Sequence, residues 1–195
     1  MTTSFSLGQR GLDAAPIIYS LLSGHPASAV CESCLRSHSE WLTTTVTLLE
    51  ADAVLRKVCG VDPASAAQKL AQFAAGPITV VAVDVALAIS AMTTAHTLQI
   101  DLADAILLEC CRAHGVSTIT TDDEKFARAC VAVGLTAESP LDSVVRPQVA
   151  AWESANLPAK GLPRLLFQIR HWLELQDAHV AQAFWTQSGA ESHLP

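Results

Sequence analysis

Apolar residues recur along this chain at two spacings, one typical of strands and the other typical of helices. The clearest strand pattern is the almost uninterrupted apolar run at 77–83, which predicts a strand covered on both faces. Runs rich in β-branched residues at 41–46 and 116–120 predict two more strands. Weaker patterns at 5–12 and 134–136 predict a first strand and a short edge strand.

Helical spacing fills the segments between these strands. The predicted helices cover residues 16–22, 27–37, 47–58, 62–74, 84–98, 101–114 and 122–133. Strands that alternate with helices in this way indicate an α/β fold with a mostly parallel sheet.

The C-terminal part of the chain has a different pattern. Four prolines interrupt residues 140–163, so we interpret this segment as a linker with at most short helices. Apolar residues at helical spacing then predict one helix over 165–185. We therefore expect one α/β domain over 1–140, and a linker with a C-terminal helix over 141–195. The apolar stripe of that helix is too large to leave in water, so we expect it to pack on its own domain or on a partner, such as a second copy in a homodimer.

Composition and charge narrow the classes of protein. The chain has 195 residues, half of them apolar, which is enough for one domain with its own core. A formal net charge of −7 argues against a general electrostatic attraction to nucleic acid, although bound divalent cations would reverse the sign locally. The sequence has no apolar stretch of membrane-spanning length and no secretory signal at its N-terminus, so we expect a cytoplasmic protein.

The six cysteines admit two interpretations. Cys31 and Cys34 form the only CxxC spacing, and His38 follows four residues later, so half of a zinc site can be drawn. The alternative is that all six are small buried residues in a reducing compartment. We predict free thiols.

Five carboxylates lie at the ends of the apolar runs and are the candidate site residues. They are Asp13, Glu50, Asp101, Asp104 and Asp123. In a parallel α/β sheet, binding sites form at the carboxyl ends of the strands, so these acids are placed to meet at one edge. Clustered carboxylates repel one another, and Mg²⁺ or Mn²⁺ would relieve that repulsion. Such an ion would polarise a phosphate and lower the pKa of water.

A structural role is the alternative for several of the acids. Asp62, Asp84, Asp101 and Asp122 each precede a predicted helix, where carboxylates are common as N-caps. Glu50 differs, because it lies inside a helical pattern and has no evident capping role.

Four segments resemble the motifs of the PIN-domain family, in the family's order. They are 12–19, 47–50, 104–109 and 121–126. The resemblance covers about residues 5–140 and implies a Rossmann-like three-layer α/β/α sandwich. It also implies a metal-dependent endoribonuclease, similar to the VapC-type toxins of toxin–antitoxin pairs.

The resemblance assigns roles to individual acids. Asp13, Glu50, Asp104 and Asp123 match the four acids of the family, and Asp101 is an additional acid one turn before Asp104. These residues would hold one or two Mg²⁺ or Mn²⁺ ions, with Glu50 as ligand or general base. The implied substrate is RNA, cut to leave 5′-phosphate and 3′-hydroxyl ends, and the implied partner is an antitoxin protein.

The sequence also departs from the family's pattern. Ala14 stands where the family usually has Thr or Ser, Asp122 stands where Asn is common, and Glu109, Cys110 and Cys111 replace small residues. These departures leave a second hypothesis open, namely a non-catalytic interaction module that uses its C-terminal helix to bind a partner.

Basic residues near the acids in sequence are few. Arg112, Lys125 and Arg128 are the closest, and each is either a phosphate contact or an ordinary surface charge.

Overall fold

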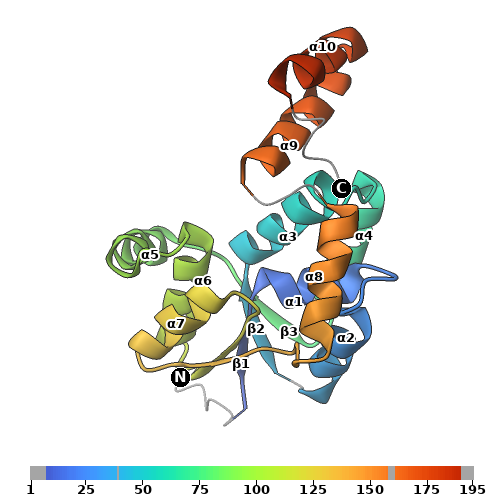
Figure 1. The fold of residues 1–195 in the computed structure, drawn as a ribbon. Coiled ribbons are helices and arrows are strands. Elements are labelled where there is room, and N and C mark those ends of the chain that lie inside the picture. Colours follow the sequence, from blue (N-terminus) through green and yellow to red (C-terminus); the bar gives the residue numbers. More distant parts are fainter. Residues whose placement is uncertain (1–7, 39, 158–160, 190–195) are drawn as a thin grey trace.

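The computed structural model describes residues 8–38, 40–157 and 161–189, and in these segments it has the predicted α/β fold. Five parallel strands form one sheet in the order β3-β2-β1-β4-β5 (Figure 1). The strands are β1 (Arg10–Leu12), β2 (Trp41–Thr44), β3 (Ile78–Val81), β4 (Thr118–Thr120) and β5 (Thr136–Glu138). The central strand β1 places Gly11 beside Leu42 on one side and Ile119 on the other.

Helices connect the strands and continue beyond the last of them. They are α1 (Ala14–Leu21), α2 (Ser28–Ser37), α3 (Thr45–Lys57), α4 (Pro63–Ala74), α5 (Val85–Leu98), α6 (Leu102–Ala113), α7 (Glu124–Ala132), α8 (Val145–Asn156), α9 (Leu162–Glu174) and α10 (Ala178–Ser188). Within the described segments, every helix is too short or too polar to cross a membrane.

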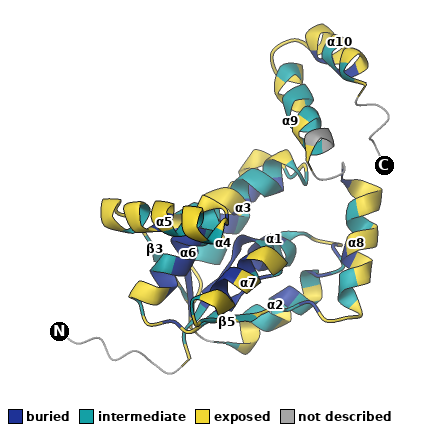
Figure 2. Cartoon of the chain, turned by 60° about the vertical axis from the view of Figure 1, so that its left-hand side comes forward, coloured by how far each residue is buried: buried dark blue, intermediate teal, exposed yellow. Residues whose placement is uncertain are grey.

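The sheet has a hydrophobic core on each face, which confirms the three-layer sandwich. Neighbouring residues of a strand point to opposite faces. Accordingly, Trp41 packs with buried residues of α1, α3 and α4, whereas Leu42 packs with those of α5, α6 and α7. The dark blue residues of Figure 2 lie along these inner surfaces, and the outer faces of the helices are exposed.

Close packing of α6 on the sheet explains one glycine. A Cβ atom at Gly11 would lie 2.5 Å from Cys111 Sγ and 3.0 Å from Ile119 Cγ1. The bare backbone of β1 therefore lets α6 approach the centre of the sheet.

Two predicted strands differ in detail from the structure. Strand β2 ends at Thr44, because the Thr44 hydroxyl accepts the Thr47 N–H at 3.1 Å and caps α3; Thr45 and Val46 are helical. Strand β3 lies at the edge of the sheet; Val81 packs on one core and Ile78 on the other, so both faces are covered, but only in part, since Thr79 is exposed. The first strand is confirmed at 10–12; residues 5–7 lie outside the described segments.

The segment predicted as a linker contains the three-turn helix α8. Val149 on α8 is buried with Ala27, Cys31 and Leu141 in a third small core. Trp152, one turn further on, contacts the His25 ring edge-on at 4.6 Å between centroids. These contacts attach α8 to the side of the α/β body, as Figure 1 shows.

The single helix predicted over 165–185 is two helices. Asp177 accepts the N–H groups of His179 and Val180 and starts α10, so α9 and α10 form a hairpin. Trp185 is buried between them, with the Arg170 guanidinium 4.7 Å from its ring centroid. The apolar stripe is only partly covered, since Trp172 remains 59% exposed.

Candidate active site

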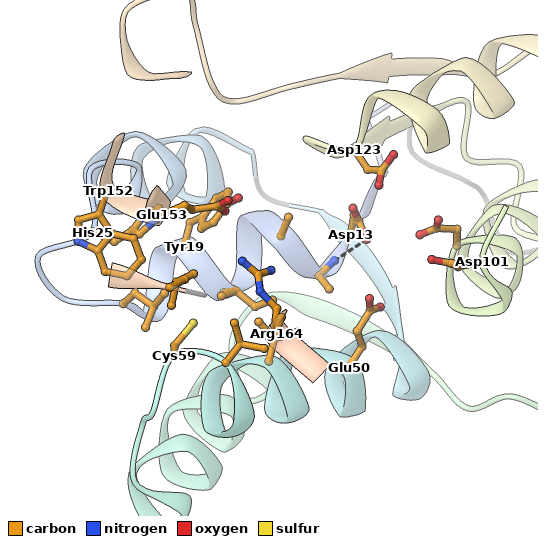
Figure 3. A pocket seen from close by; sticks show the side chains of 18 residues that line it. Asp13, Tyr19, His25, Glu50, Cys59, Asp101, Asp123, Trp152, Glu153 and Arg164 are labelled. Atoms are coloured by element: carbon orange, nitrogen blue, oxygen red, sulfur yellow. Dashed lines mark hydrogen bonds between the residues drawn. The ribbon is translucent and has the colours of Figure 1, made fainter. Parts of the chain in front are cut away.

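All five candidate acids line one pocket of about 220 Å³ (Figure 3). Asp13 directly follows β1, and Asp123 lies three residues after β4. Glu50 comes from α3, which follows β2, and Asp101 and Asp104 come from the start of α6. The carboxyl edge of the sheet therefore gathers them, as the sequence predicted.

Asp13 is the most firmly positioned of the five. Its side chain is 6% exposed, and its carboxylate accepts the Ala14 N–H at 2.6 Å and the Thr121 hydroxyl at 2.6 Å. The same hydroxyl oxygen accepts the Asp123 N–H at 3.0 Å. Burial raises the pKa of Asp13, while these hydrogen bonds oppose the rise. Thr121 thus supplies a hydroxyl to Asp13 where the neighbouring Ala14 has no hydroxyl to offer. The sequence had suggested no role for Thr121.

Asp123 has both of the roles considered for such acids. One carboxylate oxygen accepts the N–H groups of Lys125 and Phe126, at 2.7 and 2.9 Å, and so caps α7. The carboxylate also lines the pocket. Asp101 precedes α6, but its side chain makes no capping hydrogen bond, so capping does not explain its position.

The remaining acids of the capping hypothesis lie outside the pocket. Asp62 caps α4 through Ser65 N–H, and Asp84 caps α5 through Leu87 N–H, as expected. Asp122 does not cap α7; it pairs with Arg146 at 2.9 Å and thereby connects the end of the sheet to α8.

Mutual repulsion and burial change the protonation of the inner acids. The pKa of Asp104 rises to about 8, chiefly through burial and then through the charges of Asp13 and Glu50. The pKa of Glu50 rises to about 7, first through loss of hydration and then through the charges of Asp13, Asp101 and Asp123. Glu50 is partly exposed, so solvent screens some of this effect. In the absence of a cation, these two carboxylates therefore retain protons close to neutral pH.

The donor atoms suit a hard divalent cation. Carboxylate oxygens are the ligands that Mg²⁺ and Mn²⁺ prefer, and a cation would relieve the repulsion that raises the pKa values. Over residues 8–38, 40–157 and 161–189, no three His, Cys, Asp or Glu side chains are close enough to hold an ion as they stand. Metal binding at the acids would therefore require side-chain movements. The half-site drawn at Cys31, Cys34 and His38 does not form a metal group either.

All six cysteines lie in the described segments, and none is in a disulfide. Burial raises the pKa of Cys31 and Cys130 to about 12 and that of Cys110 to about 11. These groups are therefore protonated thiols, and they pack as small core residues.

The other end of the pocket is built by residues that sequence reasoning did not identify. The rings of Tyr19 and His25 are stacked 4.6 Å apart, and Trp152 from α8 meets His25 edge-on. Glu153 from α8 lies beside this aromatic group, and Arg164 from α9 lies between the group and the acids (Figure 3). Trp152, Glu153 and Arg164 lie far from the acids along the chain, and no motif in the sequence connects them with the site.

The basic residues that are near the acids in sequence lie outside the pocket. Arg112 pairs with Glu109 at 2.9 Å, and Arg128 lies 3.9 Å from Glu124. Neither they nor Lys125 line the pocket. Glu109 also accepts the Thr94 hydroxyl at 2.7 Å, so this departure from the family's pattern connects α5 to α6 and lies away from the site.

Solved structures confirm the fold by comparison. VapC20 of Mycobacterium tuberculosis, described as a sarcin–ricin loop cleaving toxin, superposes with a TM-score of 0.53 at 16% identity over 65% of this chain and 96% of its own. PAE2754 of Pyrobaculum aerophilum superposes with a TM-score of 0.52 at 17% identity, over 73% of this chain and 96% of its own. A chain of VapBC2 from Rickettsia felis, whose structure includes a DNA fragment from its promoter, superposes with a TM-score of 0.51 at 15% identity, over 67% of this chain and 98% of its own.

Of the two sequence comparisons, one finds a match. A search of curated proteins found no significant match. The profile of the PIN domain, however, matches residues 12–132, which include every candidate acid and most of the sheet. The chain therefore belongs to the PIN-domain family.

Proposed function

We propose that this protein is a metal-dependent endoribonuclease and the toxin of a toxin–antitoxin pair. The observation that supports it best is the convergence of Asp13, Glu50, Asp101, Asp104 and Asp123 in one pocket of a PIN-domain fold. The resemblance to VapC structures supports the toxin assignment, and the VapBC complex among them supports a protein antitoxin as partner.

The surroundings of each acid suggest its role in the site. Asp13, whose carboxylate is fixed by hydrogen bonds from Thr121 and Ala14, would be the least mobile ligand of the ion. Asp104 and Asp123 would complete the ligand set, and Asp101 lies one turn before Asp104. Mg²⁺ or Mn²⁺, when bound, would neutralise charge on the scissile phosphate and lower the pKa of water.

Glu50 is suited to accept a proton from the attacking water. Its side chain lines the pocket, and its pKa is about 7 while the site holds no cation. Its position on α3 places it across the pocket from Asp123, as Figure 3 shows. A cation nearby would lower this pKa, so that Glu50 is ionised when the site is loaded.

The test is cleavage of a structured RNA by the purified protein in the presence of Mn²⁺. Cleavage is expected to stop in EDTA and in the Asp13→Asn variant. Asp84→Asn is the matched control, because Asp84 only caps α5 and Asn also serves as an N-cap. Expression in bacteria should arrest growth for the wild type and the control, but not for Asp13→Asn. Full activity in EDTA would exclude the metal mechanism.

A groove beside the C-terminal hairpin favours a second function, that of an interaction module. It measures about 580 Å³ and lies between α9 and the turn from α3 to α4. Leu165, Trp172 and Leu175 line it and are 51%, 59% and 72% exposed, which is unusual for large apolar side chains. A protein that cleaves no RNA but forms a stable complex that Trp172→Asp abolishes would support this function.

A further inference from the structure

One arginine lies in the acid-lined pocket, and it comes from the C-terminal extension. Arg164 is in the first turn of α9, beyond the residues 12–132 that match the PIN domain. Figure 3 shows its guanidinium between the acids on one side and the ring of Tyr19 on the other.

We propose that Arg164 binds a phosphate group of the RNA next to the bond that is cut, so that the C-terminal extension completes the substrate site. This inference rests on the proposed nuclease function. The guanidinium is planar and presents paired N–H donors, which match the oxygens of a phosphodiester.

The charges of the pocket support this role. The five candidate acids and Glu153 line the pocket and repel a polyanion, and a bound cation would offset only part of that charge. Among the described residues that line the pocket, Arg164 is the only Lys or Arg. His25 adds no charge at neutral pH, because burial lowers its pKa. An RNA phosphate that enters the pocket therefore meets its counter-charge at Arg164.

The aromatic side chains beyond Arg164 favour RNA over a small anion. Beyond Arg164 lie the half-buried rings of Tyr19 and Trp152. Aromatic side chains beside a cationic group are the usual surface for single-stranded nucleic acid, because bases stack on rings while phosphates pair with cations. We therefore expect a base of the RNA to lie at the aromatic end of the pocket when a phosphate pairs with Arg164.

The experiment measures RNA affinity apart from catalysis. A fluorescent single-stranded RNA of mixed sequence is titrated with the full chain carrying Asp104→Asn, so that it is not consumed, with and without Arg164→Ala. Loss of a charged hydrogen-bond partner should weaken binding about 10- to 100-fold. The slope of log affinity against log salt should fall by about 0.7, as for one lost phosphate contact on a single strand.

Controls separate a phosphate contact from a general effect of charge. Arg36→Ala removes the same charge from a side chain that is 71% exposed on α2 and outside the pocket, so it should change affinity little. Arg164→Lys should restore part of the affinity, because it keeps the charge without the paired donors. Titration with Mn²⁺ alone should show no weaker metal binding in Arg164→Ala.

Three results would overturn the inference. These are equal RNA affinity with and without Arg164, an equal loss in Arg36→Ala, or faster cleavage by Arg164→Ala than by the wild type. The last would mean that Arg164, which has interactions within its own chain, blocks the site. If the wild type binds RNA through Arg164 but cleaves none, the nuclease proposal fails and this inference stands. If it binds no RNA, both fail.

Discussion

Asp104→Asn should make the metal-free protein more stable while it abolishes cleavage. Asp104 is half-buried in the first turn of α6, and burial together with the charges of Asp13 and Glu50 raises its pKa to about 8. The raised pKa means that the folded state binds a proton more tightly than the unfolded state does. The stability of the wild type therefore falls as the pH rises from about 4 to about 8. Asn has nearly the same shape and cannot ionise, so it avoids this loss.

The magnitude follows from the same pKa. The difference between about 8 and the ordinary 3.8 sets an upper limit of about 5 kcal/mol at pH 8. Solvent screening and rearrangement of the other acids reduce this figure, so we expect about 1–2 kcal/mol. For a chain of this size, that corresponds to a rise in Tm of about 2–8 °C. The gain should be several times smaller at pH 5, where the wild-type carboxyl is already protonated in the folded state.

The assay is thermal unfolding of both proteins in EDTA at pH 5 and pH 8, and again at pH 8 with Mn²⁺. Added Mn²⁺ should raise the Tm of the wild type and change that of Asp104→Asn much less, because the variant lacks one ligand. Asp84→Asn is the control that should show neither effect. A lower Tm for Asp104→Asn in EDTA at pH 8, or the same gain at both pH values, would refute the electrostatic reasoning.

Other parts of the structure give further expectations. Thr121→Val removes the hydroxyl that donates a hydrogen bond to Asp13, so it should lower the free energy of unfolding by about 1–3 kcal/mol in chemical denaturation and reduce cleavage. Unchanged values would show that Asp13 needs no such support. Gly11→Ala places a Cβ atom against Cys111 Sγ, so it should cost about 1–3 kcal/mol, and an equally stable variant would contradict the close packing of α6. The six cysteines should all react with an alkylating reagent after unfolding without reductant, and mass spectrometry that finds a disulfide or a bound zinc would show otherwise. Deleting residues 160–195 should lower solubility or change the mass measured by light scattering, because the groove residues on α3 and α4 lose their cover; an unchanged mass, solubility and Tm would show that the hairpin is dispensable.

The sequence predicted the body of the fold because local and long-range requirements agree there. Strand β4 and helices α6 and α7 follow apolar spacings that also match their burial. The errors occurred where a side chain or the topology overruled the pattern. The β-branched pair Thr45 and Val46 favours a strand, yet the capping hydroxyl of Thr44 starts a helix. The apolar content of β3 does not reveal that it lies at an edge of the sheet.

The acids of the site could be predicted, but their supporting residues could not. Asp13 and Asp123 follow strands, so parallel topology alone brings them to one edge. The hydrogen bond from Thr121 to Asp13 depends on atomic positions that no spacing encodes. Trp152 belongs to a helix in the segment that the prolines marked as a linker, and Arg164 lies one residue before the start of the helix predicted over 165–185. Both reach the pocket because α8 packs on α2 and α9 follows α8.

We expect the binding of protons, metal ions and RNA to this pocket to be coupled through charge. At pH 7, Asp104 and Glu50 hold protons for part of the time, so a divalent cation must displace them in order to bind. Metal affinity should therefore increase between pH 6 and pH 8. An RNA phosphate bound at Arg164 would add negative charge beside the ion and favour its binding. Because such coupling is reciprocal, the ion would strengthen RNA binding by the same factor. We therefore expect the acids to weaken RNA binding until a cation has entered, and the loaded site to bind RNA more tightly than the metal-free site does.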